Sequence, residues 1–140
     1  MGSVPGIDSS MGIGSVFIMC VFCDKIKCGD YFYENDKVVA LYDAYPVSKG
    51  HCLIVPKRHF DSYFYATEGE IRAIYKAIKV VRKITDERYQ PDGYNIGVNI
   101  GEVAGQSVQH MHVHIIPRYV NDMQDPKGGV RGVIPNKQKY

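Results

Sequence analysis

The feature that most constrains this chain is a short segment in which histidines alternate with apolar residues. His110, His112 and His114 occupy every second position, with Met111 and Val113 between them. Strict alternation predicts a β-strand, because successive side chains of a strand point to opposite faces. One face can then be buried, while the other carries three imidazoles about 7 Å apart. Imidazole is the side chain best suited to proton transfer and nucleophilic attack near neutral pH, so the segment predicts a chemical site.

Other patterns predict an α+β fold around this strand. A T-x-x-E capping box at 67–70 is followed by apolar residues at helical spacing, so one long amphipathic helix is expected over 68–89. Phe22 and Ile26, four positions apart and followed by Gly29, predict a short N-terminal helix. We expect a mostly antiparallel sheet of about five strands, the third of them buried on both faces. The expected strands are 31–34, 37–42, 52–56, 94–99 and 110–116.

Composition limits the partners of the chain. Its 140 residues suffice for one domain with its own core, and 45% hydrophobic and 23% charged residues are ordinary for a globular protein. A formal net charge of +2 gives no broad basic surface, so no nucleic-acid partner is expected. No apolar run approaches the roughly 20 residues needed to span a bilayer, so no membrane partner is expected either.

The two ends of the chain differ from the middle. Residues 1–18 are rich in Gly and Ser and lack the basic and apolar regions of a signal peptide, so we expect a flexible leader or extension. Residues 19–140 then form a single domain with an extended polar tail, in which 125–129 forbid regular structure. Without an export signal, the four cysteines are expected to be reduced thiols or metal ligands in the cytoplasm.

A loop just before the histidine segment is a candidate anion site. Gly105, Gln106 and Ser107 can offer backbone N–H groups, an amide and a hydroxyl to a phosphate. A neutral imidazole beside a phosphate can attack phosphorus and displace a leaving group, after which water hydrolyses the phospho-imidazole. The spacing does not tell which of the three rings attacks. A solvent-facing row of histidines and a metal-binding tract are the alternative interpretations of this segment.

A second candidate site begins at a CxxC motif. Cys20 and Cys23 supply half of a four-coordinate zinc site, and His51 and His59 are further candidate ligands. The alternative is a pair of reduced structural cysteines, and the spacing alone leaves both interpretations open.

Taken together, these motifs resemble the histidine triad (HIT) family of nucleotide hydrolases and transferases. The resemblance extends over nearly all of residues 19–140 and excludes residues 1–18. The matching motifs, in family order, are Cys20-x-Phe22-Cys23, Asp43 at a strand end, Gly50-His51-x-Leu53-Ile54-Val55-Pro56-Lys57-x-His59, Gly101-Glu102-x-Ala104-Gly105-Gln106-Ser107-Val108 and His110-x-His112-x-His114-Ile115-Ile116.

The resemblance implies a homodimer of α+β subunits that binds a purine nucleotide with its α-phosphate at the histidines. His112 is then the nucleophile that becomes nucleotidylated. The resemblance also assigns a role to each remaining site residue: His114, His51 and Ser107 assist catalysis, Asn99, Gln106 and Ser107 contact the phosphates or the leaving group, Asp43 binds the ribose, and Phe22, Ile26 and Leu41 line the base. Asp43 suits that role, since a carboxylate only accepts hydrogen bonds.

The resemblance further implies a structural zinc ion and no organic cofactor. Some members of the family, and the related galactose-1-phosphate uridylyltransferases, bind zinc at matching positions. Those positions are Cys20, Cys23, His59 and His110 here. Zinc on His110 would hold the backbone beside His112 rather than take part in the reaction.

The segment after the triad narrows the range of expected substrates. Ile116-Pro117-Arg118 departs from the Gly-Gly-Arg ending of the phosphoramidase branch, and the tail at 125–135 also resembles bacterial and archaeal members and the fragile-histidine-triad hydrolases. This similarity favours a dinucleoside polyphosphate as substrate. The alternatives are a nucleoside phosphoramidase, a phosphorylase, and a nucleotide-binding regulatory or scaffold protein without significant turnover.

Overall fold

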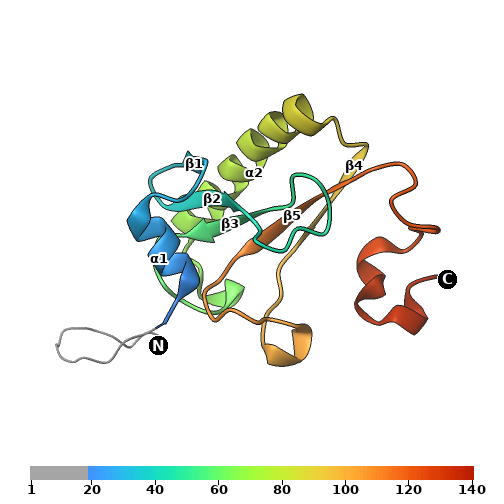
Figure 1. Ribbon diagram of the computed structural model, residues 1–140. Coiled ribbons are helices and arrows are strands. Elements are labelled where there is room, and N and C mark those ends of the chain that lie inside the picture. The colour runs from blue at the N-terminus through green and yellow to red at the C-terminus, as the bar shows by residue number, and fades with distance from the viewer. Residues whose placement is uncertain (1–18) are drawn as a thin grey trace.

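The fold is a five-stranded antiparallel sheet with one helix packed on each face (Figure 1). The computed structural model describes residues 19–140, and the leader expected at 1–18 lies outside the described residues. The strands are ordered β1-β2-β3-β5-β4, and every neighbouring pair is antiparallel. The helices and strands are α1 (Val21–Cys28), β1 (Tyr33–Glu34), β2 (Val38–Tyr42), β3 (Cys52–Pro56), α2 (Glu68–Tyr89), β4 (Gly93–Gly97) and β5 (Val113–Arg118). The predicted α+β class, sheet and two helices are therefore confirmed.

The centre of the sheet is buried on both faces. Alternate strand residues pack against α2 on one face, including Val38, Ile54 and Val113. The other set packs against Phe22 of α1 and includes Leu53. All of β3 is buried, which confirms the interpretation of its continuous apolar run. None of the helices formed by the described residues is long and apolar enough to cross a membrane.

The long helix has the bounds that its capping box predicts. The Thr67 hydroxyl accepts a hydrogen bond from the backbone N–H of Glu70 at 3.1 Å, and the Glu70 carboxylate accepts one from the backbone N–H of Thr67 at 2.8 Å. These two bonds satisfy N–H groups that have no partner within the helix. The helix ends at Tyr89, and the φ of 51° at the following Gln90 lies in the left-handed region.

The histidine-bearing strand is shorter than its alternating pattern predicts. We expected a strand from residue 110, but β5 begins at Val113. The pairing with β3 begins only at Val113, and before it the backbone N–H of Met111 donates to the carbonyl of Phe60 at 2.7 Å instead of to a neighbouring strand. His110 and His112 thus lie on an irregular segment and only His114 lies on β5, so the expectation of three imidazoles on one strand face is wrong.

Three further expectations needed correction. The strand predicted at 94–99 ends at Gly97, and the first strand contains only Tyr33 and Glu34. The polar tail lacks regular structure at 125–128 but then forms 3-10 turns at Gly129–Val133 and Pro135–Lys137. Arg131 holds these turns together by donating to the carbonyls of Gln138 at 3.0 Å and Lys137 at 2.8 Å. In Figure 1 the turns (red) lie beside β4, beyond the body of the sheet.

Candidate active site and metal cluster

The candidate site lies on the face of β5 that points away from α2. Val113 and Ile115 pack toward α2, so His114 points to the opposite face. The loop between β2 and β3 brings Asp43 and His51 to the same place, and His112 approaches from the segment before β5. The structure therefore brings together residues that lie as many as 71 positions apart in the sequence, from 43 to 114.

The ring of His112 is held in one orientation and one tautomer. Its Nδ1 lies 2.8 Å from the carbonyl oxygen of His110. A carbonyl only accepts hydrogen bonds, so Nδ1 carries the proton and Nε2 keeps its lone pair. The ring of Phe22 packs edge-on against this imidazole, with the centroids 5.0 Å apart. Burial lowers the pKa of His112, outweighing the bond to the His110 carbonyl and the charge of Asp43, which raise it. The ring is thus neutral near pH 7, as a nucleophile must be.

Beside this ring, His51 and His114 form a hydrogen-bonded pair in which His51 is the donor. The backbone N–H of Val47 donates to Nδ1 of His51 at 3.1 Å, so the proton of the neutral ring is on Nε2. That Nε2 lies 3.0 Å from Nδ1 of His114 and 3.3 Å from Oδ2 of Asp43. His114 therefore accepts at Nδ1 and carries its own proton on Nε2, which is free to donate to a ligand. Burial lowers the pKa of both rings.

The same hydrogen bond argues against a metal ion between these residues. Asp43, His51 and His114 have ligand atoms within 4.8 Å of one another, as a metal site requires. While Nδ1 of His51 accepts the Val47 N–H, its Nε2 is protonated and has no lone pair for a cation. The arrangement is a hydrogen-bonded relay rather than a ligand set.

The loop before the triad is held by a buried side chain. Oε1 of Gln106 accepts from the backbone N–H of Gly101 at 2.9 Å, and its Nε2 donates to the carbonyls of Asp61 at 2.7 Å and Val108 at 3.1 Å. Both N–H donors of the Gln106 amide are thus used in shaping the loop. The neighbouring Ser107 is exposed and is free to contact a ligand.

The remaining predicted contact residues take separate places around the histidines. The amide of Asn99 lies 3.9 Å from the point where a Cβ on Gly105 would stand, so Asn99 borders the same loop as Ser107. Leu41 is buried in the cluster that contains Phe22, and Ile26 packs against that cluster. The predicted base-contact residues therefore lie on the α1 side, next to His112.

Four of the predicted metal ligands converge on one point. Nδ1 of His110 lies 3.4 Å from Sγ of Cys20, 3.5 Å from Sγ of Cys23 and 3.1 Å from Nδ1 of His59. The ligand atoms of these four residues all lie within 4.8 Å of one another. Nε2 of His110 donates to the Pro56 carbonyl at 2.8 Å, which leaves the lone pair of Nδ1 directed at the two sulfurs.

The sulfur–nitrogen distances of 3.3 to 3.5 Å in this cluster fit a tetrahedral zinc ion. Zinc bonds of about 2.0 Å to nitrogen and about 2.3 Å to sulfur place tetrahedral ligands roughly 3.3 to 3.8 Å apart. Burial, together with the neighbouring Cys20, raises the pKa of Cys23 to about 12, so the thiol keeps its proton unless a cation replaces it. The other two cysteines, Cys28 and Cys52, lie outside this cluster.

Backbone groups are the part of the site that the sequence did not reveal. The carbonyls of His110 and Pro56 and the N–H of Val47 set the tautomers of three histidines. Every residue carries such groups, so no residue type or spacing marks them. The role of Gln106 inside its loop was missed for a related reason, because a Gly-Gln-Ser segment does not show which way its amide points.

Comparison with known proteins identifies the family. The family model of the HIT domain matches residues 27–121. An uncharacterized HIT-like protein of Methanocaldococcus jannaschii is 41% identical over 119 residues, which cover 79% of this chain and 88% of that protein. The protein hit of Bacillus subtilis is 44% identical over 105 residues, 71% of each chain. The chain belongs to the HIT family, with relatives in bacteria and archaea.

Solved structures agree with this assignment. A HIT family protein from Bacillus anthracis superposes with a TM-score of 0.70 at 34% identity, covering 74% of this chain and 76% of that chain. A zinc-bound histidine triad family protein from Mycobacterium smegmatis gives a TM-score of 0.67 at 29% identity, covering 76% and 80%. The predicted fold and family are therefore confirmed.

Two relatives carry the name of an activity. An adenylylsulfatase of Arabidopsis thaliana is 35% identical over 107 residues, which cover 74% of this chain and 54% of that protein. A bis(5'-adenosyl)-triphosphatase of Dictyostelium discoideum is 30% identical over 100 residues, covering 71% and 67%. The family therefore includes hydrolases of adenylyl compounds.

Proposed function

We propose that this protein is a nucleotide hydrolase or nucleotidyl transferase that works through a covalent bond to His112. The observation that carries the proposal is the hydrogen bond from Nδ1 of His112 to the His110 carbonyl, 2.8 Å long. It leaves an unprotonated Nε2 on a buried, neutral ring, beside a ring that offers an N–H donor. Those are the properties that a nitrogen nucleophile at phosphorus requires.

The reaction follows from these two rings. Nε2 of His112 attacks the α-phosphorus, a P–N bond forms, and the bond from phosphorus to the leaving group breaks. Water then attacks the same phosphorus and breaks the P–N bond, which regenerates the neutral imidazole. The N–H of His114 and the hydroxyl of Ser107 donate to phosphoryl oxygens as negative charge develops on them. His51 holds the tautomer of His114 by donating to its Nδ1.

The rest of the nucleotide has complementary surroundings. Asp43 offers carboxylate oxygens to the ribose hydroxyls, although Oδ1 already accepts from the backbone N–H of Tyr45 at 2.8 Å. Phe22, Ile26 and Leu41 form the apolar support for a purine base. Asn99, whose amide lies beside Gly105, is the candidate for a further contact with the phosphates.

A dinucleoside polyphosphate is the substrate that we favour. The similarity to a bis(5'-adenosyl)-triphosphatase supports this choice, as does the ending of the triad segment in Ile116-Pro117-Arg118. A nucleoside phosphoramidate would place its phosphorus in the same position and differ only in the leaving group. A nucleotide-binding regulatory protein remains the alternative of a different class, and it needs no attack by His112.

The test combines a substrate panel with His112→Asn. The panel is a diadenosine polyphosphate, adenosine phosphoramidate and adenylyl sulfate, each assayed with water or inorganic phosphate as the acceptor. We expect the wild-type protein to form an acid-labile nucleotidyl adduct on His112, and His112→Asn to bind AMP normally without turnover. Turnover of the variant at the wild-type rate contradicts the covalent mechanism. Nucleotide binding by the wild type without any turnover supports the regulatory alternative.

We also propose that Cys20, Cys23, His59 and His110 hold a structural zinc ion. The convergence of their ligand atoms within 4.8 Å and the zinc-bound relative from Mycobacterium smegmatis support this proposal. A bound zinc ion would supply positive charge that keeps the thiols ionised and fixes the backbone at His110. We expect elemental analysis to find a single zinc per chain, lost in Cys23→Ser and kept in Cys28→Ser. Equal metal content in the two variants contradicts the assignment.

Finally, we propose that the protein is a homodimer formed across the edge of β4. Among the described strands, β4 pairs only with β5, and Ile96 on this strand is 46% exposed. An unpaired edge strand with apolar side chains is a template for a second strand. We expect sedimentation to show a dimer for the wild type and a monomer for Ile96→Lys. A monomeric wild type refutes the proposal.

A further inference from the structure

The loop that carries two of the site residues is held largely by hydrogen bonds within the loop itself. Residues 43–51 connect β2 to β3 without regular structure and supply Asp43 and His51. Within the loop, the N–H of Asp43 donates to the carbonyl of His51 at 3.1 Å, and the N–H of His51 donates to the carbonyl of Ser48 at 3.1 Å. These bonds shape the loop but do not tie it to β5, which carries His114.

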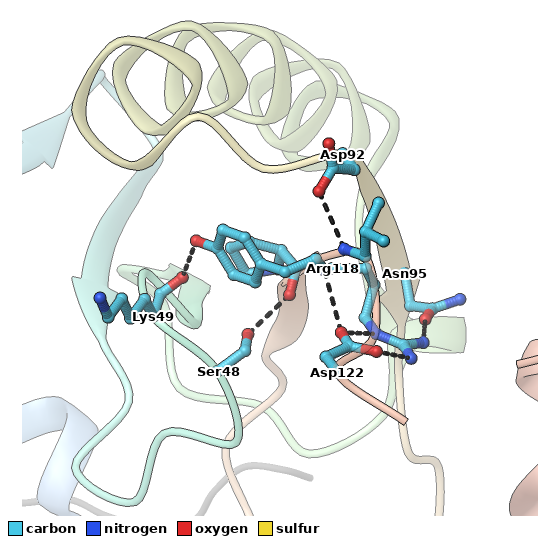
Figure 2. Close-up of polar contacts among 9 residues, drawn as sticks. Ser48, Lys49, Asp92, Asn95, Arg118 and Asp122 are labelled. Atoms are coloured by element: carbon cyan, nitrogen blue, oxygen red, sulfur yellow. Dashed lines mark hydrogen bonds and ion pairs between the residues drawn. The ribbon is translucent and has the colours of Figure 1, made fainter. Parts of the chain in front are cut away.

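Two side-chain hydroxyls tie the loop to the end of β5 (Figure 2), in addition to the contact between His51 and His114. The hydroxyl of Ser48 donates to the carbonyl of Pro117 on β5 at 2.7 Å. The hydroxyl of Tyr119, just past the end of β5, donates to the carbonyl of Lys49 at 2.7 Å. Both distances are the ordinary length of a good O–H···O hydrogen bond. The two bonds reach adjacent residues of the loop, immediately before Gly50 and His51.

The tyrosine is itself held in place. Its backbone N–H donates to Oδ2 of Asp122 at 3.0 Å, and Arg118 donates to both oxygens of that carboxylate at 2.7 and 2.8 Å. The guanidinium also reaches Oδ1 of Asn95 on β4 at 2.7 Å (Figure 2). Planar, bidentate pairs of this kind fix geometry better than single contacts. The backbone that carries the side chain of Tyr119 is therefore held rigidly at the end of the sheet.

We propose that Ser48 and Tyr119 are positioning residues that set the contact between His51 and His114. His114 lies on β5, and both tying bonds end on or just beyond the same strand. One strand thus fixes the position of both rings. The 3.0 Å contact from Nε2 of His51 to Nδ1 of His114 loses its strength with a loop shift of about half an ångström. The effect on turnover rests on the proposed function, whereas the effect on the loop does not.

The experiment measures loop opening and chemistry in the same variants. Tyr119→Phe and Ser48→Ala each remove one hydroxyl, and Ser48→Thr keeps it. Tyr75→Phe is the matched control, because Tyr75 is exposed on α2. Amide hydrogen exchange is followed at the loop N–H groups and in α2, and adduct formation on His112 is followed in single turnovers with the best substrate of the panel.

We expect Tyr119→Phe and Ser48→Ala to speed exchange of the loop amides about 2- to 12-fold, while exchange in α2 stays unchanged. This factor corresponds to the net free energy of one ordinary hydrogen bond. Adduct formation slows in the same two variants, while Ser48→Thr and Tyr75→Phe behave like the wild type. Unchanged loop exchange overturns the proposal, and so does equal acceleration in the loop and α2, which indicates a role in overall stability only. If the wild type forms no adduct, the exchange data still decide whether the two hydroxyls hold the loop, and the proposed function fails separately.

Discussion

Acid should destabilise the metal-free protein chiefly through one buried imidazole. The side chain of His110 is fully buried, and burial lowers its pKa from 6.5 to about 4, outweighing the bond to the Pro56 carbonyl. Above pH 6.5 the ring is neutral in both the folded and the unfolded chain. Between pH 6.5 and pH 4 the unfolded chain binds a proton that the folded chain does not, so the free energy of unfolding falls as the pH falls.

The size of the effect follows from the gap between the two pKa values. A gap of about 2.5 pH units at 1.36 kcal/mol per unit gives a loss of about 3 kcal/mol by pH 4, below which the contribution of His110 levels off. For a domain of this size, that loss is a large fraction of the total stability. Burial also lowers the pKa values of His51, His112 and His114, so their contributions have the same sign.

The assay is urea unfolding of chelator-treated wild type and His110→Gln at several pH values between 7 and 4. Glutamine cannot titrate, yet its amide can still donate to the Pro56 carbonyl. We expect the wild type to lose about 3 kcal/mol more than the variant over this range, since the other histidines affect both proteins equally. Parallel pH dependence in the two proteins would refute the assignment of the acid sensitivity to His110.

Two further predictions concern the backbone around the site. Gly50 has a φ of 86°, and a Cβ there would lie 2.9 Å from the ring of Tyr89, so Gly50→Ala should cost about 2 to 4 kcal/mol in urea unfolding. Gly29 has a φ of 74° but open space around it, so Gly29→Ala should lower the free energy of unfolding by only about 1 kcal/mol. Equal losses of stability at the two glycines contradict the packing argument. Thr67→Ala should cost about 1 kcal/mol by removing the hydroxyl that accepts the Glu70 N–H, and an unchanged urea midpoint contradicts that role of the capping box.

Local patterns were sufficient for most of the fold. The bounds of α2 follow from its capping box and helical spacing, and the burial of β3 follows from its continuous apolar run. The start of β5 was wrong because alternation describes where side chains point, whereas a strand also needs hydrogen-bonded neighbours. Met111 finds its partner in Phe60, which is distant in sequence, and no pattern within 110–116 reports that bond.

The candidate site was predictable to the same extent: the identities of its side chains could be predicted, but their hydrogen-bonding surroundings could not. Residue types and the family resemblance identified the histidines, and the structure brings the predicted ligand set of Cys20, Cys23, His59 and His110 together. The spacing alone did not distinguish the three rings, whereas the structure does, because the ring of His110 turns to the sulfurs while its carbonyl holds His112. The tautomers of His51, His110 and His112 depend on backbone groups that every residue possesses, so they follow only from the three-dimensional structure.

The order of the strands has a consequence for how the chain folds. β3 and β4 are not neighbours, and only β5, the last strand in the sequence, pairs with both. Until residues 113–118 have been synthesised and inserted, the two parts of the sheet keep open edges that can pair with other chains. The contacts that β5 makes are long-range, so its insertion is expected to be a late and slow event. The strand that carries His114 also completes the sheet, which means that a chain interrupted before residue 113 has neither a continuous sheet nor the relay between His51 and His114.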